Sequence, residues 1–290
     1  MSAEVFDGFA FSEGIYEGLR SRVLKLKARG IVPGLAVIYG KGVLPAESYV
    51  RAKIKASAKA GVSCGIIPMR ASDSERDYVR TIQRVLKDKE IHGLILVKPF
   101  PERVNPDKLE SLTSPDKDVE GLGAFHFGKF FMARRFEEIE EEGLIVPATA
   151  LAIAEIARKS IPSLKGKKAL VVGRSNIVGS PAAHLLTMMD VTVTLSHSKT
   201  KNLKKEVHEA DIVVSAVGRP HLIHGSWIKK GAVIIDAGTS SVRGKLTGDV
   251  DLNGALKKAA LVTPIPGGVG PVTAALLLRN VVSLAERRLP

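Results

Sequence analysis

Tyr49 and Lys53 are the first residues of the chain whose types and spacing could do chemistry. They stand four positions apart in a stretch of good helix formers, so their side chains share one face of a predicted helix. A lysine held away from water has a lowered pKa and can act as an acid or base near neutral pH. A tyrosine beside it can orient the amine or pack against a flat ligand. The same pair on a solvated helix face would have no function, and the spacing alone leaves both interpretations open.

A glycine-bounded turn near the middle of the chain is the second such feature. An apolar run over 169–172 ends at Gly173, and a short polar turn leads to Gly179 and an Ala/Leu-rich segment. This pattern predicts a buried strand, a tight turn and a helix N-terminus, where backbone N–H groups can bind the pyrophosphate of a dinucleotide. Ser175 occupies the middle glycine position of the usual G-x-G-x-x-G, so an ordinary strand–helix turn stays open as the alternative.

The residues around this turn favour NADP over NAD. Arg174 directly follows the first glycine, and Ser198 and Thr200 follow the next predicted strand, where the adenosine ribose is recognised. No acidic residue stands directly after that strand to hold a 2′-hydroxyl. A basic and hydroxylic set suits a 2′-phosphate.

The Tyr-x-x-x-Lys pattern of Tyr49 and Lys53 also marks short-chain dehydrogenases. In that family the pattern lies downstream of the glycine turn, whereas in this chain it lies upstream, which argues against membership.

Composition bounds the class of protein. The 290 residues are 45% hydrophobic and 25% charged, which suits one large or two medium globular domains. We find no apolar run long enough to span a bilayer and expect no membrane partner. The single Cys64 excludes an internal disulfide framework and fits a reducing cytoplasm, and its apolar neighbours predict a buried, inert thiol. The seven His residues lack ligand spacing, so no metal site is predicted.

The net charge of +13 could indicate nucleic acid, a membrane surface or an anionic small ligand. The Lys and Arg residues are spread along the chain, often beside Glu, and aromatic residues make up only 5%. No base-stacking platform is therefore evident. We expect no nucleic-acid partner, and a solvated basic surface that helps to attract phosphate-bearing or poly-acidic ligands.

Strands alternate with helices along the chain, which predicts parallel sheets with covered faces. The fold class is α/β with two lobes, and the C-terminal helix returns to the first lobe. An irregular loop is expected over 114–131, and an acidic cluster over 137–142 is expected on a solvated face. Predicted helices cover 14–29, 46–60, 74–87, 147–159 and 272–286. Predicted strands cover 35–39, 62–68, 93–97, 169–172, 191–195, 212–216, 232–236 and 260–262.

Several motifs occur together in a particular order. They are Ser48-Tyr49-Val50-Arg51-Ala52-Lys53-Ile54-Lys55, Lys117-Asp118-Val119-Glu120-Gly121, the turn from Gly173 to Pro181, His197-Ser198-Lys199-Thr200, Ala210-Asp211-Ile212-Val213, Gly248-Asp249-Val250-Asp251 and Thr263 to Thr273. In this order and spacing the chain resembles the bifunctional methylenetetrahydrofolate dehydrogenase/methenyltetrahydrofolate cyclohydrolase family. The resemblance covers nearly the whole chain, and its glycine turn and Pro-Gly-Gly-Val-Gly-Pro run are quite specific.

The resemblance implies a reaction and roles for residues. Methylenetetrahydrofolate would give a hydride to NADP, and water would open the resulting methenyl cation to 10-formyltetrahydrofolate. Lys53 would serve the cyclohydrolase step, and Tyr49 would pack along the folate and help to set the lysine. Glu120, where relatives usually have Asp, would accept N–H bonds from the pterin edge.

The resemblance also implies a homodimer and assigns binding residues and domains. Residues 1–148 plus 268–290 would form the folate-binding catalytic domain, and 149–267 would form the NADP-binding Rossmann-type domain. Further folate contacts would come from Pro266, Gly267, Gly268 and Val269. The cofactor would contact Gly173, Arg174, Ser175, Ile177, Val178, Ser198, Thr200, Ala216, Val217, Gly218, Thr239, Gly270 and Thr273.

Two departures from the family affect the predicted cleft between the lobes. Relatives usually have Val-Gln-Leu-Pro-Leu-Pro after the third strand, with the Gln bonded to the catalytic lysine, whereas this chain has Val97-Lys98-Pro99-Phe100-Pro101. The usual Pro-Cys-Thr-Pro-x-Gly is Pro147-Ala148-Thr149-Ala150-Leu151-Ala152 here. Our hypothesis is that Lys98 is a catalytic residue that replaces the Gln and lowers the pKa of Lys53 by repulsion. The alternative is that Lys98 points to solvent.

These departures keep two other functions open. The chain could be a monofunctional methylene-tetrahydropterin dehydrogenase that lacks cyclohydrolase activity. It could also be a non-catalytic nucleotide- and folate-binding homologue. Assays with methylenetetrahydrofolate plus NADP, and separately with methenyltetrahydrofolate, discriminate among the three.

Overall fold

The computed structural model describes residues 2–289, except for the side chains of Leu44 and Pro45. Met1 and Pro290, the outer ends of the predicted folate domain, lie outside the described residues. The chain divides into two compact units, each described by itself. The six-stranded unit comprises Met1–Glu13, Phe131–Glu142 and Pro147–Leu276. The three-stranded unit comprises Gly14–Phe130, Gly143–Val146 and Leu277–Pro290.

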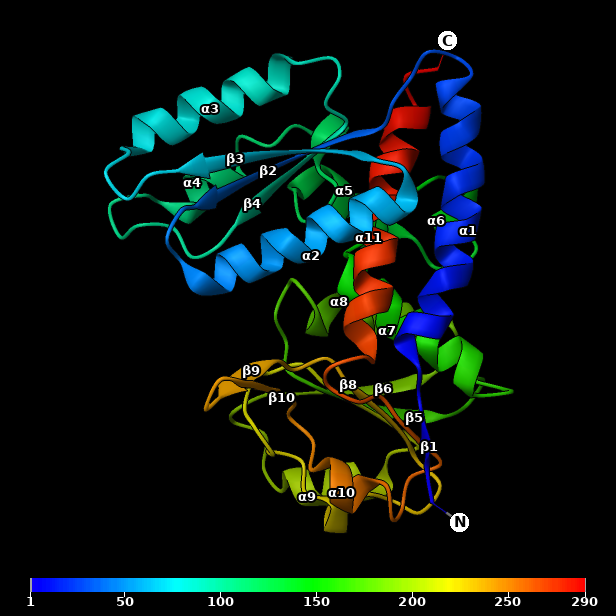
Figure 1. The fold of residues 1–290 in the computed structure, drawn as a ribbon. Coiled ribbons are helices and arrows are strands. Elements are labelled where there is room, and N and C mark those ends of the chain that lie inside the picture. The colour runs from blue at the N-terminus through cyan, green and yellow to red at the C-terminus, as the bar shows by residue number, and fades with distance from the viewer. Residues whose placement is uncertain (1, 290) are drawn as a thin grey trace. The chain divides into compact units, whose positions relative to one another are not determined.

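A parallel sheet in the order β1-β11-β8-β7-β5-β6 organises the six-stranded unit (Figure 1). The two strands that follow β5 in the chain lie on opposite sides of it, β6 on one and β7 on the other. That reversal is a topological switch point, where open α/β sheets bind ligands. The strands are β1 (Glu4–Val5), β5 (Lys168–Val172), β6 (Thr192–Ser196), β7 (Ile212–Ser215), β8 (Val233–Asp236) and β11 (Leu261–Val262).

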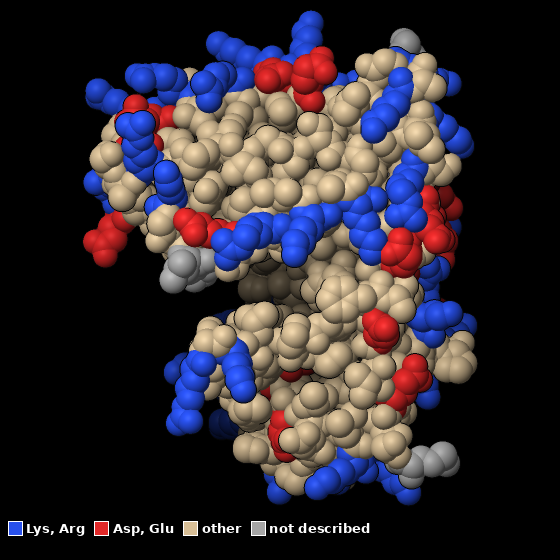
Figure 2. Space-filling view, in the orientation of Figure 1, with Lys and Arg blue, Asp and Glu red and all other residues tan. Residues whose placement is uncertain are grey.

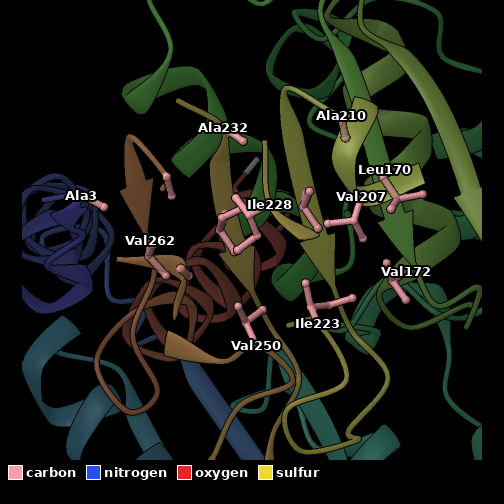
Figure 3. Close-up of a cluster of buried hydrophobic side chains, with 14 residues drawn as sticks. Ala3, Leu170, Val172, Val207, Ala210, Ile223, Ile228, Ala232, Val250 and Val262 are labelled. Atoms are coloured by element: carbon pink, nitrogen blue, oxygen red, sulfur yellow. The ribbon is translucent and has the colours of Figure 1, made fainter. Parts of the chain in front are cut away.

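Apolar side chains from the strands and the connecting segments form the core of this unit (Figure 3). Strand residues Leu170, Val213, Ile234 and Val262 belong to the cluster, as does Ile228 from a connection. An antiparallel hairpin of β9 (Ser240–Val242) and β10 (Lys245–Thr247) adds a small second sheet. The helices of this unit are α6 (Glu138–Glu141), α7 (Ala148–Ser160), α8 (Gly179–Met188), α9 (Leu203–Glu209) and α10 (Leu252–Ala255), with a 3₁₀ turn at Gly225–Trp227.

The three-stranded unit contains the parallel sheet β3-β2-β4, with helices α2 and α3 on opposite faces (Figure 1). Helix α3 (Glu75–Lys87) begins with a capping box between Ser74 and Asp77 and buries Tyr78, Ile82 and Val85. The strands are β2 (Gly34–Gly40), β3 (Ser63–Met69) and β4 (Gly93–Val97). The other helices are α2 (Leu44–Ala60), α4 (Pro106–Glu110) and α5 (Ala124–Met132), with a 3₁₀ turn at Pro115–Lys117.

Helices α1 (Gly8–Lys27) and α11 (Val269–Glu286) each begin in the six-stranded unit and end in the three-stranded unit. Within the latter, Arg22 of α1 forms a two-pronged pair with Glu286 of α11, at 2.9 and 2.6 Å, and donates to the Ser283 hydroxyl. The predicted return of the last helix to the first lobe is therefore confirmed.

Several local predictions were wrong. The segment 114–131 is not a continuous loop, because it contains the 3₁₀ turn and nearly all of α5. The parallel strand β1 was missed, since two residues are too short to show a period. Helix α11 is long and apolar enough to cross a membrane by length and composition alone, contrary to our expectation. Of its 18-residue window, 61% is buried, as in the core helix of a folded domain.

Candidate active site

Helix α2 places Tyr49 and Lys53 on one face, as their spacing predicts. The Lys53 side chain is buried, with 4% of the residue exposed, and its Nζ lies 4.5 Å from the centre of the Tyr49 ring. The ring face carries partial negative charge, so it favours an ammonium above it. The alternative that the pair lies on a solvated helix face is therefore excluded for Lys53.

Burial lowers the pKa of Lys53 from 10.5 to about 8, because the ammonium loses its hydration. The negative charge of Glu120 acts in the opposite direction, as does Cys64 to a smaller extent when its thiol is ionised. Tyr49 is 38% exposed. The pKa of its phenol is raised, first by desolvation of the hydroxyl and then by Glu120, so the phenol stays protonated at neutral pH. Lys53 is therefore the group of this pair that can exchange a proton there.

Glu120 lies in the segment 117–121, and the residues beside it in this segment fix the backbone. The buried Lys117 ammonium donates to the carbonyls of Val85 and Asp88, at 2.6 and 2.5 Å. It thereby supplies hydrogen-bond donors to carbonyl groups at the C-terminal end of α3. The Asp118 carboxylate accepts from the backbone N–H groups of Gly121 and Gly123, at 2.9 and 2.8 Å. These bonds fold a tight turn directly around Glu120.

Two further contacts fix the same turn. Gly121 has a φ of +67°, and a Cβ there would lie 2.8 Å from the Ile145 carbonyl oxygen, so only glycine fits. Asn280 of α11 is buried and donates from its amide to the carbonyls of Val119 and Val146, at 2.9 and 3.0 Å. The last helix thereby joins the backbone just before Glu120 to the 145–146 segment that packs against Gly121.

The pKa of Glu120 is raised from 4.5 to about 7, primarily by burial and less by the charges of Asp118 and Glu110. Lys53, and more weakly Lys98, pull that pKa back down. Glu120 and Lys53 therefore change protonation within the same range around neutral pH. The arrangement can accept a proton from, or return one to, a ligand held beside Tyr49.

The proposed repulsion of Lys53 by Lys98 is not what the structure shows. Lys98 pairs with Glu110 of α4 at 2.5 Å, and the two side chains are 49% and 41% exposed. Burial, and not a like charge, lowers the Lys53 pKa, and the groups acting on it include no Lys98. Lys98 instead acts electrostatically on Glu120.

Cys64 of β3 differs from the predicted inert, buried thiol, since it is half-buried. Its pKa is raised by burial, while the nearby Ser57 hydroxyl and the charge of Lys53 lower it. β3 is an edge strand whose residues are mostly part-exposed, which the apolar neighbours of Cys64 did not reveal.

The glycine turn of the six-stranded unit lies at the switch point of the sheet. Gly173 has a φ of +110°, and a Cβ there would lie 2.7 Å from the Ala216 carbonyl oxygen. A Cβ on Gly179 would lie 1.9 Å from the Gly173 carbonyl oxygen. The Ser175 hydroxyl accepts from the Val178 N–H at 3.2 Å, and Ser180 donates to the Arg174 carbonyl at 3.1 Å. The turn is a backbone cradle that fits a dinucleotide pyrophosphate.

The other predicted cofactor residues follow the carboxyl ends of the strands of the same sheet. Ser198 and Thr200 follow β6, and the Thr200 hydroxyl accepts from the His197 N–H at 2.9 Å. Arg174, Ile177 and Ser198 are exposed. Ala216, Val217 and Gly218 follow β7, and Thr239 follows β8.

The Pro-Gly-Gly-Val-Gly-Pro run forms the turn that starts α11. Gly267 has a φ of +105°, and the Gly8 N–H donates to its carbonyl at 2.8 Å. Gly268 and Val269 are buried, whereas Pro266 and Gly270 are exposed. The Thr273 hydroxyl donates to the Val269 carbonyl at 3.1 Å within the helix. The predicted folate residues thus fall in both units, with Tyr49 and Glu120 in one and Pro266 to Val269 in the other.

Basic side chains form a stripe along the exposed side of α2, as Figure 2 shows. Arg51, Lys55 and Lys59 lie four residues apart and are exposed, while Lys53 on the same helix is buried. The positive charge of α2 is therefore divided between a solvated face and one desolvated amine. This division agrees with the solvated basic surface that composition predicts.

A parallel sheet with a backbone cradle at its switch point, joined to a unit with a buried titrating lysine, defines an α/β enzyme of the dinucleotide-binding class. The comparisons make this specific. Residues 6–120 match the model of the tetrahydrofolate dehydrogenase/cyclohydrolase catalytic domain, and residues 147–289 match the NAD(P)-binding domain of the same family. The chain belongs to the tetrahydrofolate dehydrogenase/cyclohydrolase family, as its motifs predicted.

Relatives match over their full length. The chain is 39% identical over 290 residues to the bifunctional protein FolD of Bacillus subtilis, covering 100% of both chains. The bifunctional FolD enzyme of Campylobacter jejuni has a solved structure with a TM-score of 0.92 and 31% identity, covering 99% and 100% of the two chains. The Trypanosoma brucei dehydrogenase-cyclohydrolase, solved with NADP cofactor and inhibitor, has a TM-score of 0.90 and 35% identity, covering 99% and 98%. The predicted two-lobed α/β fold is thereby confirmed.

Sequence reasoning missed the residues that support the site. Lys117 and Asp118 were predicted only as members of a motif, and no role was predicted for Glu110 or Asn280 and no electrostatic effect for Cys64. The one available signal was Gly121, since a glycine directly after an acidic residue indicates a turn. Asn280 gave no signal, because a single amide in an apolar helix has many explanations.

Proposed function

We propose that this protein is an NADP-dependent methylenetetrahydrofolate dehydrogenase and methenyltetrahydrofolate cyclohydrolase. It would oxidise 5,10-methylenetetrahydrofolate to the 5,10-methenyl form and hydrolyse that product to 10-formyltetrahydrofolate. One observation carries the proposal: Lys53 is buried against Tyr49 with a pKa of about 8, so a neutral amine is accessible at cellular pH. The family match supports the same assignment.

A neutral Lys53 suits the hydrolytic step, because the methenyl substrate is a cation and an ammonium would repel it. The amine can take a proton from the attacking water and return it as the ring opens. Tyr49 keeps its proton, lies beside the amine and offers a ring face to a flat pterin. The reaction belongs to tetrahydrofolate interconversion and one-carbon metabolism, and its product is a one-carbon donor for purine biosynthesis.

Glu120 would bind the pterin edge through its carboxylate, accepting from the amino and ring N–H groups. Its pKa of about 7 means that the ionised, accepting form increases as the pH rises through neutrality. Lys98 would act through Glu120, since its charge favours the ionised carboxylate. This role for Lys98 replaces direct action on Lys53.

NADP, when bound, accepts the hydride that leaves the methylene carbon. The cradle fits this cofactor, since glycine at 173 and 179 lets the backbone of the turn pack closely where any side chain would clash. Arg174, Ser198 and Thr200 would hold the 2′-phosphate. The remaining contacts would come from Gly173, Ser175, Ile177, Val178, Ala216, Val217, Gly218, Thr239, Gly270 and Thr273, and folate would also contact Pro266, Gly267, Gly268 and Val269.

We further propose that residues 1–148 plus 268–290 act as the folate-binding catalytic domain and 149–267 as the NADP-binding domain. The compact units support the return of the last helix, while Met1–Glu13 groups with the six-stranded sheet through β1. A cytoplasmic homodimer that uses neither a membrane nor nucleic acid would complete the description. Sedimentation would test the dimer, and a salt-dependent duplex-binding assay would test the last point.

A second candidate rests on one observation. Lys98 stands where relatives usually have the Gln that bonds the catalytic lysine, and it pairs with Glu110. A dehydrogenase without cyclohydrolase activity would fit that departure. Two assays on the purified protein separate the candidates, one with methylenetetrahydrofolate plus NADP and one with methenyltetrahydrofolate alone. We expect both to be active, and activity in the first alone would contradict the bifunctional assignment.

A further inference from the structure

The Asp249 carboxylate accepts four hydrogen bonds, one from Ser215 at the end of β7 and three from the segment that follows β7. Its Oδ2 accepts from the Ser215 hydroxyl at 2.9 Å and from the N–H groups of Val217 and Gly218 at 2.8 and 3.3 Å. Its Oδ1 accepts from the Arg219 N–H at 2.6 Å. Three successive backbone N–H groups therefore converge on one fully buried carboxylate.

The segment 216–219 packs against the glycine cradle. A Cβ on Gly173 would meet the Ala216 carbonyl oxygen at 2.7 Å and the Val217 side chain at 3.0 Å, so the two loops at the switch point pack in contact. The Ser240 hydroxyl donates to the Gly218 carbonyl at 2.7 Å. A shift of the segment would therefore change the shape of the cradle.

A second buried carboxylate, that of Asp236, holds the backbone next to Asp249. It accepts from the N–H groups of Gly238 and Val250, at 3.0 and 2.9 Å, and so links the segment after β8 to the residue that follows Asp249. Burial, with the charge of Asp249 as a further cause, raises the pKa of Asp236 to about 7. A Cβ on Gly238 would lie 2.0 Å from the Asp249 carboxylate, so no side chain can enter between these segments.

We propose that Asp249 is a positioning residue for the cofactor: it pulls the N–H groups of 217–219 inward and so fixes the loop on which NADP lies. It acts through the loop and does not touch the cofactor. This inference rests on the proposed function, in which Ala216, Val217 and Gly218 contact NADP. Asp249 belongs to the motif Gly248-Asp249-Val250-Asp251, from which no role was predicted for it.

Asp249→Asn tests the proposal, because the amide nitrogen cannot accept the bonds that one carboxylate oxygen accepts now. We expect the Kd for NADP, measured by calorimetry, to rise about tenfold or more, as loss of charge-assisted bonds to a buried group implies. Hydrolysis of methenyltetrahydrofolate needs no NADP, so its kcat/KM measures whether the lysine site is still formed. A general loss of structure would raise the Kd for NADP and lower kcat/KM together, whereas a positioning role raises the Kd for NADP and leaves kcat/KM unchanged.

Asp251→Asn is the matched control. Asp251 also accepts two backbone bonds, from Gly225 and Gly254 at 3.4 and 3.1 Å, but it caps α10 and lies outside the cofactor segment. It should lower the melting temperature and leave the Kd for NADP within about twofold. An equal effect of the two substitutions on NADP affinity would overturn the proposal.

Ser215→Ala covers the case in which Asp249→Asn does not fold. It removes one of the four donors, so we expect a smaller rise in the Kd for NADP, about two- to fivefold. An unchanged Kd in either variant overturns the positioning role while the proposed function stands. If the unsubstituted protein binds no NADP, both the proposed function and this inference fail.

Discussion

The glycine cradle after β5 is built from backbone, whereas the Lys53 site is built from side chains far apart in the sequence. In the cradle, Gly173 and Gly179 pack against carbonyl oxygens with no room for a Cβ. In the lysine site, the properties of Lys53 depend on burial and on Glu120, which is turned into place by Asp118, Gly121 and Asn280. The cradle can fail by a change of shape alone, while the lysine site can fail by a change of charge in an unchanged shape.

The largest effect should follow removal of the amine. Lys53→Met keeps an unbranched chain of similar length and removes the titrating group. We expect cyclohydrolase kcat to fall by about 10²- to 10⁴-fold, the usual contribution of a general acid–base group. The Kd for NADP should stay unchanged. Lys55→Met, on the exposed side of the same helix, is the control and should keep full activity. A fall in kcat of less than tenfold for Lys53→Met would contradict the assigned role.

The cradle should break with the smallest possible side chain. Gly179→Ala places a Cβ 1.9 Å from the Gly173 carbonyl oxygen, and backbone must move to accept it. We expect a loss of about 1–3 kcal/mol in the free energy of unfolding and at least a tenfold rise in the Kd for NADP.

Gly18→Ala is the matched control for that substitution. A Cβ there meets nothing within 4 Å, and Gly18 lies in the interior of α1. It should stabilise the protein by about 0.5–1 kcal/mol and leave cofactor affinity unchanged. Denaturant unfolding measures the free energy of unfolding, and calorimetry measures the Kd for NADP. Equal changes of these two quantities in the two variants would show that the cradle has room for a Cβ at position 179.

Lys53 should also cost the protein stability below its folded-state pKa. Its pKa is 10.5 in the unfolded chain and about 8 in the fold, so the folded state binds fewer protons between these values. The difference corresponds to about 3 kcal/mol, present at neutral pH and lost as the pH rises from 8 to 10.5. Lys53→Met should therefore be more stable than the unsubstituted protein at pH 7, with a gap that narrows above pH 8. A pH-independent gap in chemical unfolding would contradict burial of the amine.

The smallest effect should come from Lys98. The ion pair with Glu110 is part-exposed, and such pairs contribute about 0–1 kcal/mol. Lys98→Gln should change the free energy of unfolding by no more than that and leave the apparent pKa of Lys53 in place. The pKa of Glu120 should rise slightly, because Lys98 helps to lower it. A marked shift of the Lys53 pKa in this variant would restore the repulsion hypothesis.

The same contrast explains what the sequence could predict. Glycine positions, apolar runs and motif order report local backbone requirements, and they predicted the cradle, the strand alternation and the pair at 49 and 53. Burial depends on tertiary packing, so no local pattern distinguishes the buried Lys53 from the exposed Lys55 two residues on. The partner of Lys98 and the donors to Asp249 come from other segments, and α5 was hidden because its glycine and aromatic residues resemble an irregular loop.

The most direct test of the account is the pH dependence of cyclohydrolase kcat/KM in the unsubstituted protein and in Glu120→Gln. For the unsubstituted protein we expect a rise with an apparent pKa near 8, reporting the neutral amine of Lys53 in the free enzyme. Removing the negative charge of Glu120 should move that value downward, since Glu120 raises it. A profile that rises only near 10.5, or one that does not move in Glu120→Gln, would contradict a desolvated Lys53 coupled to Glu120.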